Sequence, residues 1–366
     1  MKKANVFDYL EWRGDLTLDQ SEFNEIDALI LSILAYLDYS SVKENEAPSF
    51  SDVVDRINDM PDELKLNGPS IIMRSVVELA NAASMLPRFK DMGVFRFLSM
   101  TDEEKEIQFA AVTFLLPDKT AFLSFRGTDN TLVGWKEDFN MCFTDEIPSQ
   151  IEAAKYAAAV AKDLPMSLRL GGHSKGGNLA IWAATHLSVE QQERILTVYN
   201  NDGPGFSEKF INCEMYRNIR SKIRSFVPES SIVGVLMEHD KYKTIRSSNP
   251  LVLQHDPFSW VVLGTHFVYD DARSFSGRRF EKAINTWILS MSAKEREELV
   301  ENVYDILVSS NAKTIDDIDK AKLKSFLCMH RTFREMGIKK QTQLMLSLSK
   351  VLFNSDILVR PSKISV

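Results

Sequence analysis

The sequence predicts an α/β fold in which a mainly parallel sheet carries flanking helices, and three features support this prediction. Strand-like and helix-like runs alternate between residues 149 and 200, a spacing typical of a parallel sheet that is covered on both faces. Short runs rich in β-branched and aromatic residues precede this region, from residue 94 onward. Helix-like segments occupy both ends of the chain, which has 366 residues, 44% of them hydrophobic. The chain is therefore long enough to bury a large core around such a sheet.

The N-terminal part, residues 1–90, is expected to be helical and to pack on the core. The segment NEIDALILSILAYLDY has apolar residues at i, i+3, i+4, i+7, i+8 and i+11, which is the period of a helix with one buried stripe. Ser21 and Asn24 are the two candidates for its N-terminal cap. A second helix is predicted from about residue 70 to residue 85, after a polar connector that contains prolines.

The sheet is expected to lie within residues 91–276. Its first three strands are predicted in VFRFLSM, QFAAVTFLL and TAFLSFRG. The turn-like PDKT joins the last two of these runs, which indicates an antiparallel meander. A helix at residues 149–164 then leads into the alternating part, in which MSLRLG and ILTVYN are strands and NLAIWAATHL is a helix.

Four more strand-like runs extend the β-rich region to about residue 270. They are SKIRSFV, YKTIRSS, LVLQH and WVVLGTHFVY. The last part of the chain, residues 277–366, returns to helical patterns with no strand signal. We therefore expect three parts, namely an N-terminal helical segment, an α/β core and a helical C-terminal region.

Composition and charge argue against several kinds of partner. The formal net charge is -7 and the chain has no long run of lysine and arginine, so we expect no nucleic-acid partner. No stretch has the length of a membrane span or the pattern of a secretory signal. The three cysteines, Cys142, Cys213 and Cys328, are far apart and indicate neither a disulfide framework nor a metal site. A cytoplasmic protein without a metal or organic cofactor is expected, and the sequence leaves its oligomeric state open.

The segment LRLGGHSKGGNLAIWAA places Ser174 between two glycines where a predicted strand gives way to a predicted helix. This is the G-x-S-x-G pattern of a nucleophile elbow, a turn so sharp that Gly172 and Gly176 have no room for a Cβ. The alternatives are a plain glycine-rich turn and a phosphate-binding loop. The order G-x-x-x-x-G-K-[ST] of a phosphate loop is absent, so the elbow is the favoured interpretation.

A serine needs a histidine base, and five histidines follow Ser174 in the chain. They are His186, His239, His255, His266 and His330. Two of them fall on predicted helices, and His266 lies inside a strand-like run. His255 follows the run LVLQ and opens the loop HDPFSW, as expected of a base at the end of the last core strand. His255 is therefore the candidate base, with His239 as the alternative.

A carboxylate is needed to orient that histidine, and the sequence leaves two candidates open. Asp202 follows the strand after the elbow helix, and Glu229 follows the next strand. Asp202 also fits a simple turn, because Asp-Gly-Pro-Gly is strong turn chemistry. We favour Asp202 slightly over Glu229.

An oxyanion hole requires two N–H groups directed at the carbonyl oxygen of a substrate. The residue after the nucleophile, Lys175, supplies one N–H by its position. The loop Gly127–Thr128–Asp129, after an earlier strand, is expected to supply the other, and the Thr128 hydroxyl is a further candidate donor.

The run FLSFRGTDNTLVGWKEDF, followed some fifty residues later by GGHSKGGNLA, resembles the class three, fungal-type lipases of the α/β-hydrolase fold. The runs YNNDGPGF, VPESSIVG and QHDPFSW look still more like a bacterial family of lipase-like hydrolases of unknown function. The resemblance covers about residues 94–260. It implies Ser174 as nucleophile, His255 as base, and Thr128 with Lys175 at the oxyanion hole. Where class three lipases have an aspartate after the strand equivalent to KIRSFV, this chain has Ser231.

These features predict a serine hydrolase of the esterase or lipase type, which cleaves carboxylic or lipid acyl esters through an acyl-enzyme. Two alternatives stay open. One is a hydrolase-fold protein that binds a ligand or partner without catalysis, for which the serine at position 231 is the main support. The other is a thioesterase or peptidase on the same fold. Lys136 and Lys175 are candidates for attracting an anionic substrate such as a phospholipid, although exposed lysines are more often simply solvated.

Overall fold

The computed structural model places an eight-stranded sheet at the centre of the molecule, with the strand order β1-β2-β3-β4-β5-β6-β7-β10. The structure describes residues 3–44, 46–68, 73–141, 143–270, 291–310, 313–314, 322–338, 340–342 and 345. The strands are β1 (Gly93–Asp102), β2 (Ile107–Leu115), β3 (Ala121–Phe125), β4 (Leu168–His173), β5 (Ile195–Asn201), β6 (Ile223–Pro228), β7 (Lys243–Ile245) and β10 (Tyr269–Asp270). Neighbouring strands from β3 to β7 are parallel, whereas β1, β2 and β10 pair in the antiparallel sense. The predicted fold class and the antiparallel meander are both confirmed.

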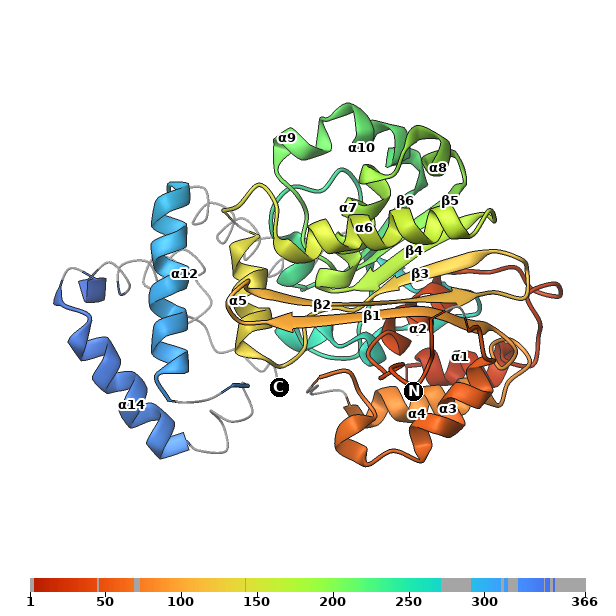
Figure 1. The fold of residues 1–366 in the computed structure, drawn as a ribbon, viewed down its shortest axis with the longest axis horizontal. Helices are drawn as coiled ribbons and strands as arrows, with labels where there is room; N and C mark the ends of the chain where they lie inside the picture. Colours follow the sequence, from red (N-terminus) through yellow and green to blue (C-terminus); the bar gives the residue numbers. More distant parts are fainter. Residues whose placement is uncertain are drawn as a thin grey trace, which may run out of the picture.

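Helices cover the two faces of the sheet, as Figure 1 shows. One face carries the N-terminal helices α1 (Val6–Arg13), α2 (Glu25–Leu34), α3 (Phe50–Asn58) and α4 (Met73–Ser84), and the other carries α6 (Pro148–Asp163), α7 (Lys175–His186) and α10 (Glu214–Ile219). Successive side chains of β3 belong to the two opposite cores. Phe122 packs among the N-terminal helices, while Leu123 and Phe125 pack under α6 and α7, because side chains alternate along a strand.

Of the two candidate caps for the first long helix, Asn24 is the one used. Its side-chain oxygen accepts from the N–H groups of Ile26 and Asp27, and the Asp27 carboxylate accepts from the Asn24 N–H. Asp27 also forms a fully buried ion pair with Arg88 at 2.5 Å. Asn24 thus caps the start of α2, and Asp27 links this helix to Arg88 in the segment that follows α4.

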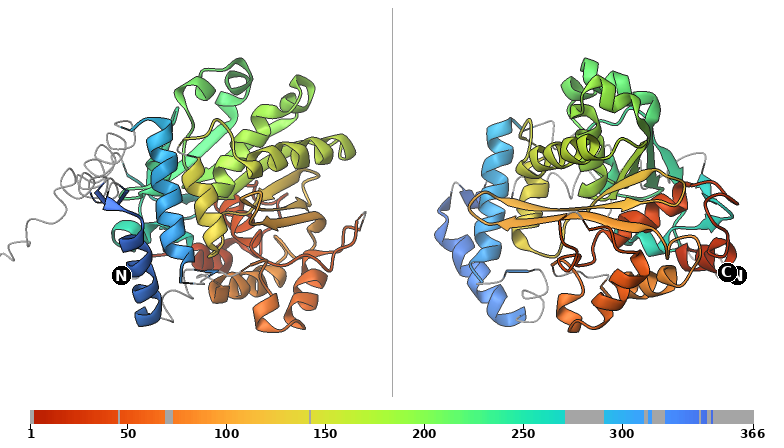
Figure 2. Two further views of the ribbon diagram at one scale, coloured as in Figure 1. Left: turned by 60° about the vertical axis from the view of Figure 1, so that its left-hand side comes forward. Right: turned by 45° about the vertical axis from the view of Figure 1, so that its right-hand side comes forward.

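Helix α5 (Leu132–Asn140) lies beside the carboxyl ends of the central strands and was not predicted from the sequence. Thr131 caps it, since its hydroxyl accepts from the Gly134 N–H. On its outer side α5 contacts α12 (Ala293–Val308), and α14 (Lys322–Glu335) packs against α12, as the views in Figure 2 also show. The ammonium of Lys136 joins the two helices, lying 2.9 Å from Glu301 and 2.7 Å from Glu106.

The short elements that complete the described chain are α8 (Val189–Glu193), α9 (Glu208–Ile211) and a small hairpin of β8 (Val262–Leu263) and β9 (His266–Phe267). The strand predicted for LVLQH is wrong, because Leu251–His255 forms a single 3-10 turn. The strand predicted for YKTIRSS is present as the three-residue β7, next to β6 in the sheet. The helical runs predicted near residues 282–291 and 342–353 fall largely outside the described residues. Among the described residues, no helix combines the length and apolar character needed to cross a membrane.

Candidate active site

Ser174 stands on the turn that joins β4 to α7. Its backbone has φ 58 and ψ -133, a region that residues with a side chain rarely adopt. A Cβ on Gly172 would overlap the backbone of Gly176, and one on Gly176 would overlap the carbonyl of Phe125. The two glycines therefore permit the sharp turn that the sequence pattern predicted, and the turn places the serine directly after β4, at the carboxyl end of that strand.

Three side chains from distant parts of the sequence meet at this turn. The Oγ of Ser174 lies 3.0 Å from the Nε2 of His255, and the Nδ1 of His255 lies 2.7 Å from the Oδ2 of Asp202. Asp202 is fully buried directly after β5, and His255 is partly exposed. With Nδ1 donating to the carboxylate, Nε2 is left as the acceptor for the serine hydroxyl, which is the arrangement that activates a serine nucleophile.

The structure places His255, rather than His239, within hydrogen-bond distance of Ser174. His255 ends a 3-10 turn and does not follow a strand, so the expectation about its location was wrong although it contacts the serine. Its carbonyl lies 2.9 Å from the Nε2 of His173, and the two imidazole rings are 4.7 Å apart. Burial lowers the pKa of His173 well below its usual value. His173 is therefore neutral, and its Nε2–H donates to the backbone that carries the base.

Of the two candidate acids, Asp202 and not Glu229 contacts Nδ1 of His255. The hydroxyl of Ser231, at the position where class three lipases have an aspartate, donates to Oδ2 of Asp202 over 2.8 Å. The ends of β5 and β6 are neighbours in the sheet, so residues after either strand reach the same place. The chain therefore has a serine, Ser231, after β6, and the carboxylate that contacts His255 belongs to Asp202, after the neighbouring strand β5.

The loop of Gly127, Thr128 and Asp129 lies beside Ser174, as expected of a loop that supplies an oxyanion hole. Ser174 is so close to Gly127 that a Cβ on the glycine would lie 3.2 Å from the serine Cβ. The N–H of Lys175 belongs to the first turn of α7, where backbone N–H groups have no partner within the helix. The Thr128 hydroxyl donates to Asp138, which has both carboxylate oxygens 2.6 Å away. In this arrangement the Thr128 hydroxyl is engaged by Asp138 and does not donate toward Ser174.

The side chain of Lys175 is buried beneath the elbow. Its ammonium donates to Glu137 Oε2 over 2.8 Å and to the Gln108 carbonyl over 2.8 Å, and 1% of the lysine and none of the glutamate side chain is exposed. Glu137 also accepts hydrogen bonds from Ser149 and from the Gln108 N–H. Lys136 is likewise buried and ion-paired. The idea that Lys136 and Lys175 attract an anionic substrate is therefore wrong, because neither ammonium faces open solvent.

Glu137 and Asp138 are the site residues that the sequence interpretation missed. Both lie on α5, the helix that follows the candidate oxyanion loop. The available signal was Thr131, a good N-terminal cap placed just before LVGWKEDFN. A helix starting there would have carried both carboxylates back toward Ser174.

Asp138 is expected to make stability depend on pH. Burial raises its pKa from 3.8 to about 6. Ionisation is therefore unfavourable to the folded state, and this cost is absent below about pH 4 and complete above about pH 6. The variant Asp138→Asn avoids this cost. The difference in free energy of unfolding between the variant and wild type should therefore favour the variant more at about pH 7.5 than at about pH 4.5. We expect this change to be about 1 kcal/mol, because the side chain is 31% exposed and solvent screens its charge. Urea unfolding at both pH values measures this difference, and an equal difference at the two would contradict it.

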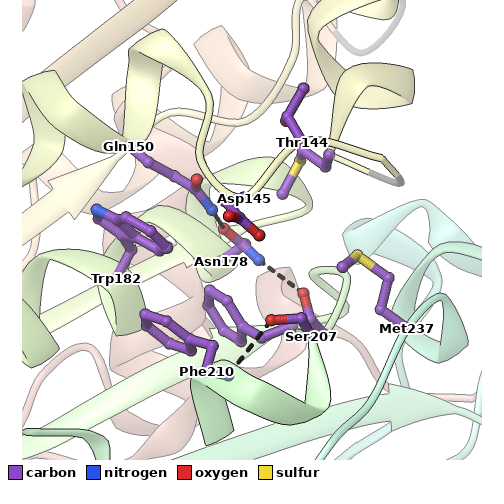
Figure 3. A pocket seen from close by; sticks show the side chains of 11 residues that line it. Thr144, Asp145, Gln150, Asn178, Trp182, Ser207, Phe210 and Met237 are labelled. Atoms are coloured by element: carbon purple, nitrogen blue, oxygen red, sulfur yellow. Dashed lines mark hydrogen bonds between the residues drawn. The ribbon is translucent and has the colours of Figure 1, made fainter. Parts of the chain in front are cut away.

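A small pocket opens beside the elbow helix α7, at Asn178 and Trp182 (Figure 3). Its walls combine aromatic and thioether side chains with polar groups, namely Met141, Thr144, Asp145, Gln150, Asn178, Trp182, Gly205, Phe206, Ser207, Phe210 and Met237. Gln150 donates to Asn178, and Asn178 donates to the carbonyls of Pro204 and Gly205. These bonds tie the loop after Asp202 to α7, and the side chains of Ser174, Asp202 and His255 do not line this pocket.

The mainly parallel sheet with helices on both faces, and the strand–turn–helix at Ser174, define a protein of the α/β-hydrolase-like fold class. The chain belongs to the Mbeg1-like family, whose model matches residues 83–305, more than half of the sequence. No curated protein sequence matched the chain. Within the described residues, no group of three or more His, Cys, Asp or Glu side chains is arranged to hold a metal ion.

Several solved lipase structures are similar to the chain. The native Rhizomucor miehei lipase propeptide complex is 17% identical, with a TM-score of 0.35 over 49% of this chain and 68% of that one. M37 lipase is 12% identical, with a TM-score of 0.36 over 58% and 70%. The lipase from Rhizopus microsporus var. chinensis is 15% identical, with a TM-score of 0.33 over 61% and 91%.

Proposed function

We propose that the chain is a serine hydrolase that cleaves carboxylic esters, including lipid acyl esters, through an acyl-enzyme on Ser174. The observation that carries this proposal is the continuous set of hydrogen bonds from Ser174 through His255 to Asp202, with lengths of 3.0 and 2.7 Å. A serine hydroxyl, an imidazole and a buried carboxylate in this order supply a nucleophile, a base and the group that orients the base.

Each step of the reaction has a residue in position for it. His255 Nε2 takes the hydroxyl proton as Ser174 Oγ bonds to the ester carbonyl carbon. The carbonyl oxygen then bears the negative charge, which the backbone N–H groups of Lys175 and Thr128 stabilise. The C–O bond to the alcohol breaks as His255 returns the proton to the leaving oxygen. Water, deprotonated by His255, attacks the acyl-enzyme and releases the acid and the free serine.

The alternative of a non-catalytic binding protein rested on the missing aspartate at position 231. Asp202 provides a carboxylate in contact with His255, so the site no longer lacks any of the three groups. The remaining alternatives, a thioesterase or a peptidase, use the same acyl-enzyme chemistry and differ in the leaving group. Ester hydrolysis is the proposal that best fits a lipase-like fold.

Labelling with a fluorophosphonate probe tests the proposal directly. The probe phosphonylates activated serines, so we expect the wild-type protein to be labelled and Ser174→Ala to be unlabelled. His255→Ala should be labelled at least about 100-fold more slowly, because the serine loses its base. Intact-mass spectrometry and tryptic mapping should place the adduct on the peptide that contains Ser174.

A buried serine outside the site provides the matched control. Ser124 lies on β3 and donates to the carbonyl of Leu31, so Ser124→Ala should be labelled like wild type. Folded wild-type protein that stays unlabelled would overturn the enzyme proposal. If labelling occurs, hydrolysis of matched p-nitrophenyl esters and thioesters of increasing chain length will separate the esterase, lipase and thioesterase assignments.

A further inference from the structure

We propose that Ser231 is a positioning residue for the acid, holding Asp202 in place and moderating how strongly it attracts the proton on His255. This inference rests on the proposed serine-hydrolase function and adds a fourth side chain to the site. It also gives a role to the polar residue after β6, Ser231, beside the carboxylate of Asp202 after β5.

The hydroxyl of Ser231 is held in one orientation. Its Oγ accepts the N–H of Gly234 at 3.2 Å and lies 2.8 Å from the Oδ2 of Asp202, to which it donates. The side chain is buried, with 1% of the residue exposed, and the Ser231 N–H donates to the carbonyl of Pro228. The Gly234 N–H holds the oxygen of this hydroxyl in place, and its hydrogen could turn to another acceptor only by losing the bond to Asp202.

The carboxylate of Asp202 is held almost entirely through one oxygen. Ser231 and His255 both donate to Oδ2. Oδ1 accepts no hydrogen bond from the part of the chain that the structure describes, and Gly234 packs on it so closely that a side chain there would overlap it. Among the described side chains, Ser231 is therefore the one donor to the carboxylate besides His255, and both donate to the same oxygen.

Two donors on one oxygen compete for the same negative charge. Without the Ser231 hydroxyl, that charge acts more fully on the proton at His255 Nδ1, which favours the protonated imidazole. The carboxylate also loses the contact that fixes its rotation. The loss of Ser231 should thus lower the rate and move the acid limb of the pH profile to higher pH, in the direction of a more readily protonated base.

The variant Ser231→Ala tests this role through the pH dependence of kcat/KM. We expect kcat/KM at neutral pH to fall about 10-fold, as for the loss of a hydrogen bond to a charged group. The acid limb should move to higher pH. Ser231→Thr keeps a hydroxyl and should restore the wild-type limb. Ser124→Ala removes a buried hydroxyl elsewhere in the fold and should move neither quantity.

A second experiment moves the acid to the neighbouring strand. Asp202 has φ 58, which glycine adopts without strain, so Asp202→Gly removes the carboxylate and leaves space for another. Because Ser231 Oγ is 2.8 Å from Asp202 Oδ2, an aspartate at 231 reaches toward the same position. We expect Asp202→Gly alone to lose roughly 1,000-fold or more in kcat, and the double variant Asp202→Gly/Ser231→Asp to recover at least about 10-fold.

The outcomes separate this inference from the proposed function. If wild type hydrolyses esters, but folded Ser231→Ala keeps the wild-type pH profile and the double variant recovers nothing, Ser231 has no positioning role and the serine-hydrolase proposal stands. If wild type neither hydrolyses esters nor takes the fluorophosphonate, the proposed function itself fails. Circular dichroism of each variant shows whether it is folded, and the double variant remains informative if Ser231→Thr does not fold.

Discussion

Replacing Asp202 with asparagine should lower kcat for ester hydrolysis by roughly 10,000-fold while changing KM only a few-fold. The amide keeps the shape of the carboxylate and tolerates the φ of 58 at this position. It removes the negative charge, however, and its NH₂ group can turn the imidazole of His255 to the tautomer that cannot accept the serine proton. Steady-state hydrolysis of a short p-nitrophenyl ester measures both constants.

Glu229 provides the matched comparison, because it follows β6 as Asp202 follows β5. Glu229→Gln makes the same chemical change without altering the carboxylate on His255, so its kcat should stay within about threefold of wild type. The opposite result, with Glu229→Gln inactive and Asp202→Asn active, would assign the acid to Glu229. A similar loss in both variants would mean that the two carboxylates act together.

The parts of the molecule that local sequence determines could be predicted. The turn at Ser174 is one, because its signature of Gly172, Ser174 and Gly176 lies within five consecutive residues. Strand β3 is another, since a short apolar run bounded by turn residues is typical of a buried strand. Both features leave a signal within a few consecutive residues of the sequence.

The sequence could not decide between Asp202 and Glu229 as the acid. Asp202 and His255 are separated by 53 residues, and their meeting depends on the path of the chain between them. That path contains the three-residue strand β7 and a 3-10 turn where a longer strand was expected. Short elements leave little periodic signal. The order of serine, acid and histidine along the chain could therefore be predicted, whereas the contact between Asp202 and His255 could not.

Lys175 shows a second limit. A lysine is usually exposed, and nothing next to it in the sequence indicates burial. Its partner Glu137 lies 38 residues earlier, on a helix that was not predicted. A buried charge depends on a distant partner of opposite sign, so its role becomes visible only when the fold brings the two together.

The buried pair of Lys175 and Glu137 is the second feature whose loss should have a large effect. Lys175→Met leaves the Glu137 carboxylate buried without its cation, and Glu137→Gln leaves the ammonium buried without its anion. Each single variant should therefore lower the free energy of unfolding by about 3–5 kcal/mol. The double variant should lose less than the sum of the two, because neither charge is then left alone. Urea unfolding followed by tryptophan fluorescence measures all four proteins.

Lys155 and Glu152 form the control pair, with the same 2.8 Å separation but 65% and 20% of their side chains exposed. Lys155→Met should cost less than about 1 kcal/mol, since solvent weakens an exposed ion pair. The buried pair also joins the residue after the nucleophile to α5, which follows the candidate oxyanion loop. Folded Glu137→Gln should thus react more slowly with the fluorophosphonate even where unfolding is negligible. Equal losses of stability for the buried and exposed pairs, with labelling unchanged, would show that the connection contributes to neither the fold nor the site.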